Sequence, residues 1–586
     1  DTLVDFFDSF AGLDKPFVVH DDGYRVRTYS YVEIAALARA FAGRLRAHGV
    51  GKGDAVVVWS ENRAEWIVAL WGALLEGAVL VPIDYRASAE YLRRIAETVS
   101  ARVVLAGHDV PAVAPSAAFS VWAISELSTP DLKVGPTPSG TPGVTAGPRA
   151  SPTDTAEIIF TSGATADPKG VVITHRNILA NIIPIEGEVV KYRKFGRPFF
   201  PIRFLNLLPL SHMFGQAMAT FVPPMLPGVV VFIHGYNPHE IVRQIKTRRV
   251  SVLVCVPKVL DVLRDHMLRL VPEVAETTTL KGRTTNGSGE HWTKRWWRYR
   301  RVHRLFGWKF WSIVVGAAPL DPDLEAFWSR LGYVVVQGYG LTETAPIAGV
   351  EVRIAPDGEI LVRGDNVTTG YYNAPDETAR AFEDGWLHTG DVGTIDAEGR
   401  LTIRGRKKEM IVTPEGLNVF PEDVERAIEA QPGVKEAAVV GASATGAAVE
   451  ERVHAVLVVE PGANAEAIVA AANAGLEDYQ RVRGVSAWPG PALPRTEGTR
   501  KLKRREIQRW VARGSSAATA PARATTVEDV LRRFVRQREV VPDTLIEALG
   551  LSSLERVELM MALEETFETT IDEGLFAAAK TVGDLS

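Results

Sequence analysis

The chain of 586 residues lacks several features that mark secreted and membrane-spanning proteins. Its single cysteine, Cys255, cannot form a disulfide within the chain and fits a reducing compartment. No run of about eighteen uninterrupted apolar residues occurs, so no transmembrane helix is expected. Residues 1–5 show no basic region before an apolar core, so no secretory signal is expected. We therefore expect a cytoplasmic protein without a Cys/His metal cluster.

What is present is an ordinary globular composition, with 46% hydrophobic and 23% charged residues. The length predicts roughly two to four domains. The net charge of −5 is unevenly distributed, because residues 525–586 hold thirteen acidic against six basic side chains. The rest of the chain is slightly basic, so electrostatic docking of the acidic module on the body is expected.

Apolar runs alternate with helical patterns over about the first 400 residues, which predicts parallel sheets in a doubly wound α/β architecture. The strand-like runs are Ala55–Trp59, Val103–Leu105, Val229–Ile233 and Val252–Val254. A second, smaller α/β pattern follows, with strands expected at Ala437–Val440 and His454–Val459. Residues 131–153 read as a surface connection rich in Pro, Gly, Thr and Ser.

The strongest local signal is the segment Thr161–Gly170, which follows the strand-like Ile158–Phe160 and precedes a helix-like run from Thr174. Its candidate phosphate ligands are Thr161, Ser162, Gly163, Thr165 and Lys169. Backbone N–H groups, hydroxyls and a lysine are the groups that cradle a polyphosphate. The Walker A pattern is absent, and the alternative is an ordinary strand-to-helix turn.

This segment resembles the phosphate loop of the adenylate-forming superfamily, which includes acyl-CoA synthetases, nonribosomal adenylation domains and luciferases. The family pattern is roughly TSGTTGxPKG, and Ala164 and Ala166 replace a Thr and a Gly. The first replacement removes a hydroxyl donor and the second restricts the backbone, so a weaker or rearranged hold on phosphate is expected.

Five further segments resemble family motifs in the family's order, which makes the resemblance specific. The first comprises Gly316, Ala317, Ala318 and Pro319, and the resemblance implies that its backbone lines the adenine pocket. The second resembles the YGxTE motif and contains Gly338, Tyr339, Gly340, Thr342 and Glu343. The resemblance implies that Tyr339 stacks on adenine, Thr342 contacts the α-phosphate, and Glu343 holds Mg²⁺.

The remaining three motifs lie closer to the C-terminus. Thr389–Asp391 resembles the TGD motif, so Asp391 is expected to accept hydrogen bonds from both ribose hydroxyls. Gly405–Glu409 resembles the GRxKD hinge, which implies a ribose contact for Arg406 and a pivot at Lys408. Gly416 matches the glycine turn that lines the pantetheine channel.

A lysine is expected to supply positive charge during adenylation. Leu493–Ile507 resembles the closing motif LPRTxxGKxxRxxL, and counting back from Arg504 places Lys501 at the catalytic lysine. Arg500 then replaces the usual glycine, and Lys503 is the rival candidate.

The resemblance implies an α/β large N-terminal adenylation domain with a small mobile α+β C-terminal subdomain, followed by an all-α helical-bundle carrier domain. We place the large domain at 1–404, the small subdomain at 405–512, a flexible linker at 513–524 and the acyl carrier domain at 525–586. The final carrier helix is expected to be cut short.

Leu207–Gly215 resembles the LPLxHxFG motif of fatty acyl and aryl members, so His212 is expected beside the reacting carboxylate. Amino-acid-activating relatives usually place an Asp here, and none occurs between Leu207 and Phe221. The region from Glu61 to Trp66 also looks like that of long-chain acyl-CoA synthetases. A medium or long fatty acid is the predicted substrate.

Leu549–Leu559 resembles the carrier motif LGLDSLxxVEL, which implies 4′-phosphopantetheine on Ser553. Ser552 replaces the usual Asp, and the alternative is a helix capped by one of these serines. The predicted cofactors are ATP, Mg²⁺ and 4′-phosphopantetheine, with CoA as a further candidate. Expected partners are a phosphopantetheinyl transferase, the chain's own carrier domain and a downstream acyltransferase or synthase.

The predicted function is an ATP-dependent fatty acid ligase that forms acyl-AMP and transfers the acyl group to its own carrier. Three alternatives stay open: a long-chain fatty acid–CoA ligase, a loading ligase for a polyketide or nonribosomal peptide assembly line, and a non-enzymatic carrier scaffold.

One segment, Trp292–Trp311, lies outside this scheme. It contains seven basic side chains and several tryptophans, and no acidic residue interrupts it. Three interpretations remain open: contact with an anionic inner membrane surface, docking of the acidic carrier, and ordinary packing of a basic helix. Nucleic-acid binding is not expected, because no recognised module is present.

Overall fold

The structure is a computed structural model, and it describes much of the chain. The described residues are 1–116, 118–128, 150–161, 168–196, 200–274, 297–316, 320–338, 340–344, 350–412, 418–442, 452–477, 480–495, 502–512, 527–531 and single positions and short stretches between 544 and 585. The chain divides into two compact units, residues 1–352 with 362–387 and residues 353–361 with 388–586.

The first unit contains a seven-stranded sheet with the order β13-β12-β11-β9-β10-β1-β2. Its strands are β1 (Pro16–Asp21), β2 (Val26–Ser30), β9 (Arg203–Asn206), β10 (Val229–Ile233), β11 (Val252–Cys255), β12 (Ser312–Val315) and β13 (Val334–Gln337). Neighbouring strands are parallel except for β2, which runs antiparallel to β1. The strands predicted near Val229 and Val252 are confirmed as β10 and β11.

A six-stranded sheet, also in the first unit, has the order β6-β5-β3-β4-β7-β8. Its strands are β3 (Ala55–Trp59), β4 (Val79–Ile83), β5 (Val103–Ala106), β6 (Ser120–Ala123), β7 (Thr155–Thr161) and β8 (Lys169–Thr174). Only the β7–β8 pair is antiparallel. Every residue of β3 and β4 is buried, which explains why these strands read as continuous apolar runs.

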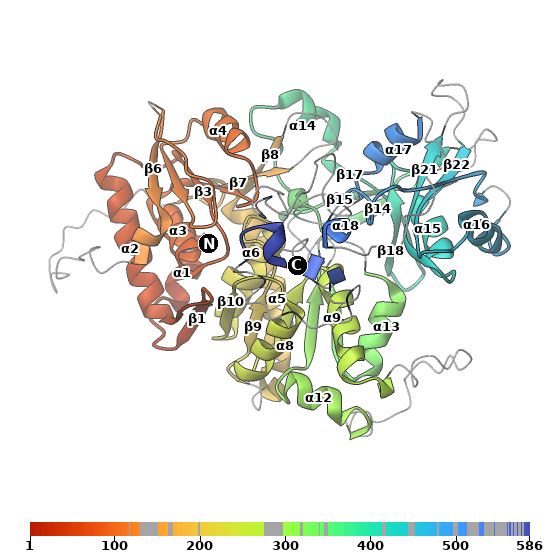
Figure 1. The fold of residues 1–586 in the computed structure, drawn as a ribbon. Helices are drawn as coiled ribbons and strands as arrows, with labels where there is room; N and C mark the ends of the chain where they lie inside the picture. Colours follow the sequence, from red (N-terminus) through yellow and green to blue (C-terminus); the bar gives the residue numbers. More distant parts are fainter. Residues whose placement is uncertain are drawn as a thin grey trace. The chain divides into compact units, whose positions relative to one another are not determined.

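Helices cover these sheets on both faces, as the doubly wound prediction requires. The helices are α1 (Leu3–Phe10), α2 (Tyr31–Ala47), α3 (Ala64–Glu76), α4 (Ala89–Thr98), α5 (His175–Gly196), α6 (Met213–Gln216), α7 (Val222–Met225), α8 (Pro238–Thr247), α9 (Pro257–Leu270), α12 (Arg300–Phe306), α13 (Pro322–Arg330) and α14 (Pro375–Ala381). Apolar residues of α8, α9 and α13 form one buried cluster with β10, β11 and β12 on one face of the seven-stranded sheet (Figure 1). Almost every residue of α3 is buried, which is consistent with its apolar sequence.

The second unit contains a three-stranded sheet of β21 (Val434–Ala442), β22 (Arg452–Val459) and β23 (Gly484–Ala487). One buried cluster joins this sheet to α15 (Pro421–Glu429) and α16 (Ala465–Asn473), and another joins it to α17 (Arg504–Ala512). The strands predicted near residues 437 and 454 are confirmed. The short pair β19 (Ile411–Val412) and β20 (Asn418–Val419) precedes α15.

A five-stranded sheet, with the order β14-β15-β17-β16 and β18 paired to β17, completes the topology. Its strands are β14 (Glu351–Ile354), β15 (Glu359–Arg363), β16 (Phe382–Glu383), β17 (Trp386–Ile395) and β18 (Leu401–Arg406). Near the C-terminus, α18 (Val527–Leu531) and a 3₁₀ turn at Val582–Leu585 share a small buried apolar cluster. Within the described residues, no helix has the length and apolar character needed to span a bilayer.

A buried carboxyl group lies beneath α6. Glu157 on β7 is fully buried and accepts one hydrogen bond from Gln216 Nε2 at 2.9 Å. Among the residues that the structure describes, neither Glu157 Oε1 nor Gln216 Oε1 has a hydrogen-bond partner. Burial raises the pKa of Glu157 to about 7, although the bond from Gln216 opposes this. A protonated Glu157 can donate to Gln216 Oε1, which would satisfy both atoms.

Replacing Glu157 with Gln should stabilise the protein at alkaline pH. The folded carboxyl keeps its proton up to about pH 7, whereas the unfolded one ionises near 4.5, so the wild type loses stability as pH rises between these values. The difference between Glu157→Gln and wild type should grow to roughly 3 kcal/mol by pH 8 and be small at pH 5. Melting temperatures of both proteins from pH 5 to 9 test this, and a pH-independent difference would contradict it.

Candidate active site

The predicted phosphate loop joins two antiparallel strands. Thr161 ends β7 and pairs in register with Lys169, the first residue of β8, and Thr161 Oγ1 donates to Lys169 O at 3.5 Å. The alternative of a strand-to-helix turn is therefore wrong, because β8 intervenes before α5 begins. Ser162, Gly163 and Thr165 lie outside the described residues.

Tyr371 joins this hairpin to the predicted magnesium ligand. The Lys169 ammonium lies over the Tyr371 ring, 5.3 Å from its centroid. The Tyr371 hydroxyl donates to Glu343 Oε1 at 3.1 Å. Burial raises the pKa of Tyr371, and the Glu343 carboxylate raises it further, so this phenol remains a neutral donor. The structure therefore brings together two residues from motifs more than 170 positions apart.

The turn that carries Glu343 is fixed by backbone contacts. Thr342–Thr344 forms a 3₁₀ turn, and Thr368 N–H donates to Glu343 O at 2.7 Å. Asn366 Nδ2 donates to Thr344 O at 2.7 Å. A half-exposed carboxylate on a fixed turn, beside a lysine, fits the oxygen ligand that Mg²⁺ prefers next to a phosphate chain. Gly340 lies just before this turn, and Tyr339 lies outside the described residues.

The predicted adenine segments follow adjacent parallel strands. Gly316 follows β12 and Gly338 follows β13, whose last residues Val315 and Gln337 are partners in register. A Cβ atom on Gly316 would lie 2.4 Å from the Phe214 ring, and one on Gly338 would lie 2.7 Å from it. Both positions therefore require glycine while the ring stays in place. Ala317, Ala318 and Pro319 lie outside the described residues.

Phe214 belongs to the LPLxHxFG segment, so the same packing holds the segment that carries His212 against the predicted adenine segments. His212 precedes α6, and its Nε2 atom lies 3.7 Å from Asp84 Oδ2. The segment itself is held by Asn62, whose side chain donates to Leu208 O at 2.8 Å and accepts from Leu210 N–H at 2.9 Å.

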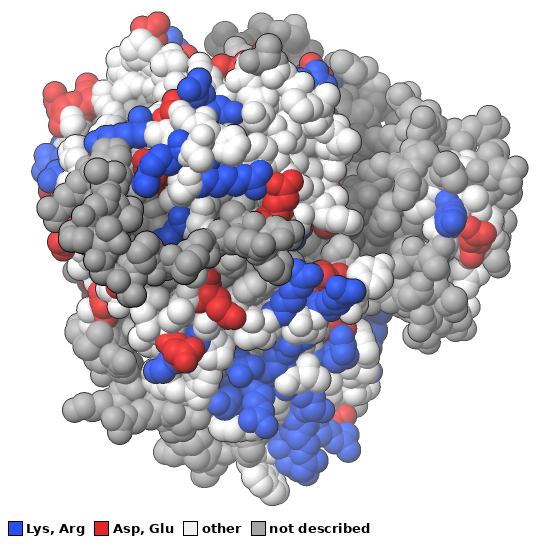
Figure 2. Space-filling view, turned by 90° about the vertical axis from the view of Figure 1, so that its left-hand side faces the viewer, with Lys and Arg blue, Asp and Glu red and all other residues white. Residues whose placement is uncertain are grey.

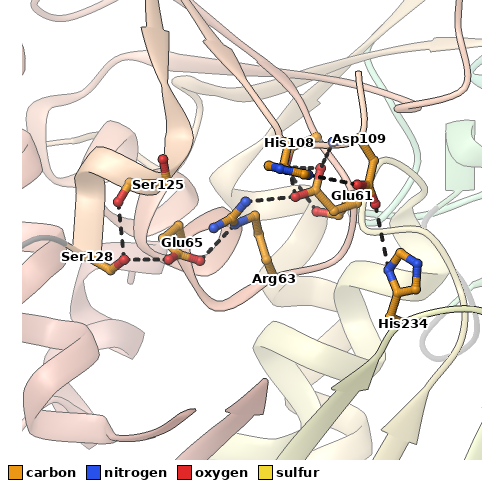
Figure 3. Close-up of polar contacts among 9 residues, drawn as sticks. Glu61, Arg63, Glu65, His108, Asp109, Ser125, Ser128 and His234 are labelled. Atoms are coloured by element: carbon orange, nitrogen blue, oxygen red, sulfur yellow. Dashed lines mark hydrogen bonds and ion pairs between the residues drawn. The ribbon is translucent and has the colours of Figure 1, made fainter. Parts of the chain in front are cut away.

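A buried ion network fixes the turn that carries Asn62 (Figure 3). Arg63 donates to Glu61 Oε1 at 2.8 Å and to Glu65 Oε2 at 2.9 Å, and its side chain is 11% exposed. Burial opposes ionisation of both acids, but the bonds from Arg63 lower the pKa of each. Ser128 also donates to Glu65. Two ionised carboxylates around one guanidinium therefore make this turn rigid.

In the second unit, the two predicted ribose contacts form one ion pair. Asp391 on β17 is in register with Arg406 on β18, and Arg406 Nε lies 2.7 Å from Asp391 Oδ1. The Asp391 side chain is buried, whereas that of Arg406 is 41% exposed. An acceptor carboxylate fixed by an adjacent guanidinium suits recognition of a diol.

The neighbours of the predicted pivot Lys408 are held by different partners. Lys407 Nζ lies 2.6 Å from Asp357 and 2.8 Å from Glu359, just before and at the start of β15. Glu409 pairs with Arg504 Nε of α17 at 2.9 Å. The chain is thus anchored to one element before Lys408 and to another after it, which is consistent with a pivot there. Gly416 lies outside the described residues.

Arg504 lies among three carboxylates. Its guanidinium contacts Glu422 at 3.1 Å, Glu425 and Glu409, and its side chain is 11% exposed. Burial raises the pKa of Glu422, and no described residue forms a hydrogen bond with its Oε2 atom. The predicted catalytic residue Lys501 lies outside the described residues, and the rival Lys503 is exposed at the start of α17.

Comparison with known proteins identifies the family. The family described as AMP-binding enzyme matches residues 10–357, more than half of the chain, and the family described as phosphopantetheine attachment site matches residues 524–586. The chain is a member of the AMP-binding enzyme family. It is therefore an ATP-dependent, AMP-forming ligase with a fused phosphopantetheine attachment site, and Mg²⁺ is the usual metal of this family.

Relatives and solved structures agree with this assignment. The long-chain-fatty-acid–CoA ligase FadD15 of Mycobacterium bovis is 32% identical over 466 residues, covering 70% of this chain and 74% of the relative. Feruloyl-CoA synthase of an Amycolatopsis species is 27% identical over 70% of this chain and 80% of its own. The o-succinylbenzoate CoA synthetase MenE of Bacillus subtilis, in complex with AMP, shares the fold with a TM-score of 0.68 at 22% identity, over 88% of this chain and 99% of its own.

The predictions of an AMP-forming ligase, of ATP and of phosphopantetheine are thus confirmed, as is the large α/β domain with a small C-terminal domain. The roles of individual site residues remain predictions. Sequence analysis missed Tyr371, Phe214 and Asp84. Phe214 could have been found, because it is the phenylalanine of the LPLxHxFG segment. Tyr371 belongs to no motif that would have indicated it.

Removing the Arg504 guanidinium should destabilise the small domain. In Arg504→Met the carboxylates of Glu409, Glu422 and Glu425 would share a partly buried site without a counter-charge, which costs on the order of 3–5 kcal/mol. Hydrogen exchange of residues 418–512 should accelerate strongly, whereas the exposed neighbour variant Arg509→Met should match wild type. Unchanged exchange in Arg504→Met would show that the cluster does not hold this domain together.

Proposed function

We propose that this ligase activates a medium- or long-chain fatty acid as its acyl-adenylate and transfers the acyl group to 4′-phosphopantetheine on Ser553 of its own carrier domain. The observation that supports this most directly is the presence of both family matches in one chain. The fatty acid assignment rests on the LPLxHxFG segment without an acidic residue and on relatives named long-chain-fatty-acid–CoA ligases. Residues 1–404, 405–512, 513–524 and 525–586 are the proposed domains, and the last is proposed to be an all-α carrier.

Adenylation brings a carboxylate to the α-phosphorus of ATP, and pyrophosphate leaves. Two anions must approach each other, so positive charge has to lie between them. In this proposal Lys501 supplies that charge, Glu343 holds Mg²⁺, and Lys169 with the hairpin loop holds the leaving phosphates. Loss of one such charge raises the barrier by on the order of 3 kcal/mol, or about a hundredfold in rate.

Thioester formation then requires a different arrangement of the small domain. Rotation about Lys408 would withdraw Lys501 and open the pantetheine channel near Gly416. Tethering keeps the carrier thiol at roughly millimolar effective concentration, which favours transfer to the chain's own carrier over free carriers. A phosphopantetheinyl transferase must load Ser553 first, and a downstream acyltransferase or synthase would take the acyl group.

Intact-protein mass spectrometry tests the acceptor. The phosphopantetheinylated full-length protein, incubated with ATP, Mg²⁺ and a panel of fatty acids, should gain one acyl mass without added CoA. Ser553→Ala should abolish that gain while still releasing pyrophosphate. Lys501→Ala should slow pyrophosphate release about a hundredfold, whereas Lys503→Ala should not.

Faster turnover with free CoA than with the attached carrier would favour the alternative of a fatty acid–CoA ligase, which the relatives' names support. Failure of every acid to release pyrophosphate would leave only the scaffold interpretation. Normal pyrophosphate release by Lys501→Ala would show that the activating residue is assigned incorrectly.

We further propose that the ligase is cytoplasmic and contacts the inner membrane surface peripherally. A surface cavity of about 460 Å³ is lined by Lys246, Arg249, Trp297, Arg300, His303, Arg304, Trp308 and Lys309, with Val250, Phe306 and Gly307. Trp297 is 67% exposed and Trp308 is 58% exposed. Figure 2 shows Lys and Arg side chains gathered on the lower part of one face of the molecule. Exposed indoles beside cations suit an anionic bilayer, which is where fatty acids partition.

Vesicle binding tests this contact. The protein should co-sediment with phosphatidylglycerol vesicles, not with phosphatidylcholine vesicles, and high salt should release it. Arg300→Glu with Arg304→Glu should weaken binding at least thirtyfold, at about 1 kcal/mol per basic residue lost. The matched control is Arg93→Glu with Arg94→Glu on the exposed surface of α4. Equal loss in both double variants would indicate non-specific attraction and contradict the assignment.

A further inference from the structure

His212 faces a carboxylate that no sequence motif indicated. Its Nε2 atom is buried and has no hydrogen-bond partner among the described residues, yet it lies 3.7 Å from Asp84 Oδ2. The imidazole as a whole is 40% exposed, so the open part of the ring lies away from Nε2. Hydrogen bonds of this kind are commonly long before substrate binds, and an approach of less than 1 Å would close this one.

Asp84 is itself held rigidly. It follows β4, and Arg86 donates to both of its oxygens, from Nε at 2.8 Å and from Nη2 at 2.6 Å. Burial opposes ionisation of Asp84, but the bonds from Arg86 and the nearby His212 hold the pKa of this carboxyl well below its usual range. Arg86 also interacts electrostatically with Tyr85 and Tyr236, and burial raises the pKa of Tyr236, so that phenol remains neutral near pH 7.

This arrangement selects one tautomer of His212. An ionised carboxylate only accepts hydrogen bonds, so it favours the ring with its proton on Nε2. Nδ1 then carries a lone pair for a partner outside the fold. An acid that orients an imidazole, which in turn faces a nucleophile, is the arrangement by which hydroxyl and thiol nucleophiles are activated.

The second half-reaction contains such a nucleophile. A pantetheine thiol has a pKa near 8.5, so at pH 7 only a few per cent is thiolate, and it must lose a proton to attack the acyl-adenylate. His212 lies two residues before Phe214, whose ring packs on both Gly316 and Gly338, the predicted adenine segments. The segment that carries His212 therefore packs against the predicted adenine segments, and the family resemblance implies that His212 lies beside the reacting carboxylate.

We propose that His212 is the general base of thioester formation and that Asp84, fixed by Arg86, is its positioning residue. The inference rests on the proposed function, because it assumes an acyl-adenylate and a thiol acceptor. In the step, the S–H bond breaks and its proton moves to His212 Nδ1. Sulfur bonds to the acyl carbon, the carbon–oxygen bond to AMP breaks, and AMP leaves with the electron pair. The imidazolium later releases its proton to solvent.

The kinetic test separates the two half-reactions. Asp84→Asn and His212→Ala should slow acyl transfer by a larger factor than they slow pyrophosphate release. Each should transfer the acyl group from preformed acyl-AMP to the carrier thiol about a hundredfold more slowly at pH 7. That deficit should shrink toward pH 9, since thiolate then forms without a base. The double variant should be no slower than His212→Ala, because the residues act as a unit.

Asp109→Asn is the matched control. Asp109 faces His234 at 3.9 Å in an exposed acid–histidine pair outside the LPLxHxFG segment (Figure 3), so both half-reactions should stay within twofold of wild type. Supplying preformed acyl-AMP keeps this test independent of adenylation. If the wild type makes no acyl-AMP from any acid, the proposed function is wrong. The transfer of acyl groups from supplied acyl-AMP would still test the role of His212.

A spectroscopic readout is independent of activity. In ¹⁵N-histidine-labelled protein without phosphopantetheine, the His212 signals are those lost in His212→Ala. Their ¹⁵N shifts should report a proton on Nε2 in wild type and a mixture of tautomers in Asp84→Asn. A proton on Nδ1 in wild type would overturn the proposal. Equal slowing of both half-reactions in Asp84→Asn, or a thiolation deficit that does not change with pH, would also overturn it.

Discussion

The aromatic ring of Phe214 occupies the space in which side chains at positions 316 and 338 would otherwise lie. Because β12 and β13 are neighbouring parallel strands in register, both glycines emerge at the same edge of the sheet, and one ring can contact both. The segment that carries His212 is thereby fixed to the segments predicted to hold adenine. Asn62, which lies beside the Arg63 ion network, also binds the backbone of that segment. The predicted acyl and nucleotide sites consequently depend on one packed contact.

As Phe214 does for the adenine segments, Tyr371 connects the predicted phosphate loop to the predicted Mg²⁺ ligand. Its backbone lies alongside β8, where it forms a bridge with Val171, while its ring faces Lys169 and its hydroxyl reaches Glu343. The Lys169 ammonium and the Glu343 carboxylate each contact the neutral Tyr371 side chain. Tyr371 thus contacts both a predicted phosphate ligand and the predicted Mg²⁺ ligand.

Sequence reasoning predicted the strands of both units because buried parallel strands read as apolar runs, and it predicted the motif residues because each motif is local. It could not predict β8 (Lys169–Thr174), because a loop rich in Gly and hydroxyl residues can precede a helix as readily as a strand. Tyr371 and Asp84 were missed for a different reason. Their roles arise from tertiary contacts with residues far along the chain, and a tyrosine or an aspartate after a strand has no distinctive local pattern. Motif spacing alone did not establish the enzyme family, and the two family matches did. The roles of individual residues still rest on the geometry of the site.

The ion pairs on either side of Lys408 are consistent with the proposed pivot at this residue. Lys407 is held by two carboxylates near β15, and Glu409 is held by Arg504, whose other contacts join α15 to α17. Backbone rotation at Lys408 would leave these ion pairs intact, and it would break the hydrogen bonds that Glu409 N–H and Met410 N–H donate to Arg406 O. Under the proposed function, these contacts make Lys408 the position at which the small domain is expected to turn between adenylation and thioester formation.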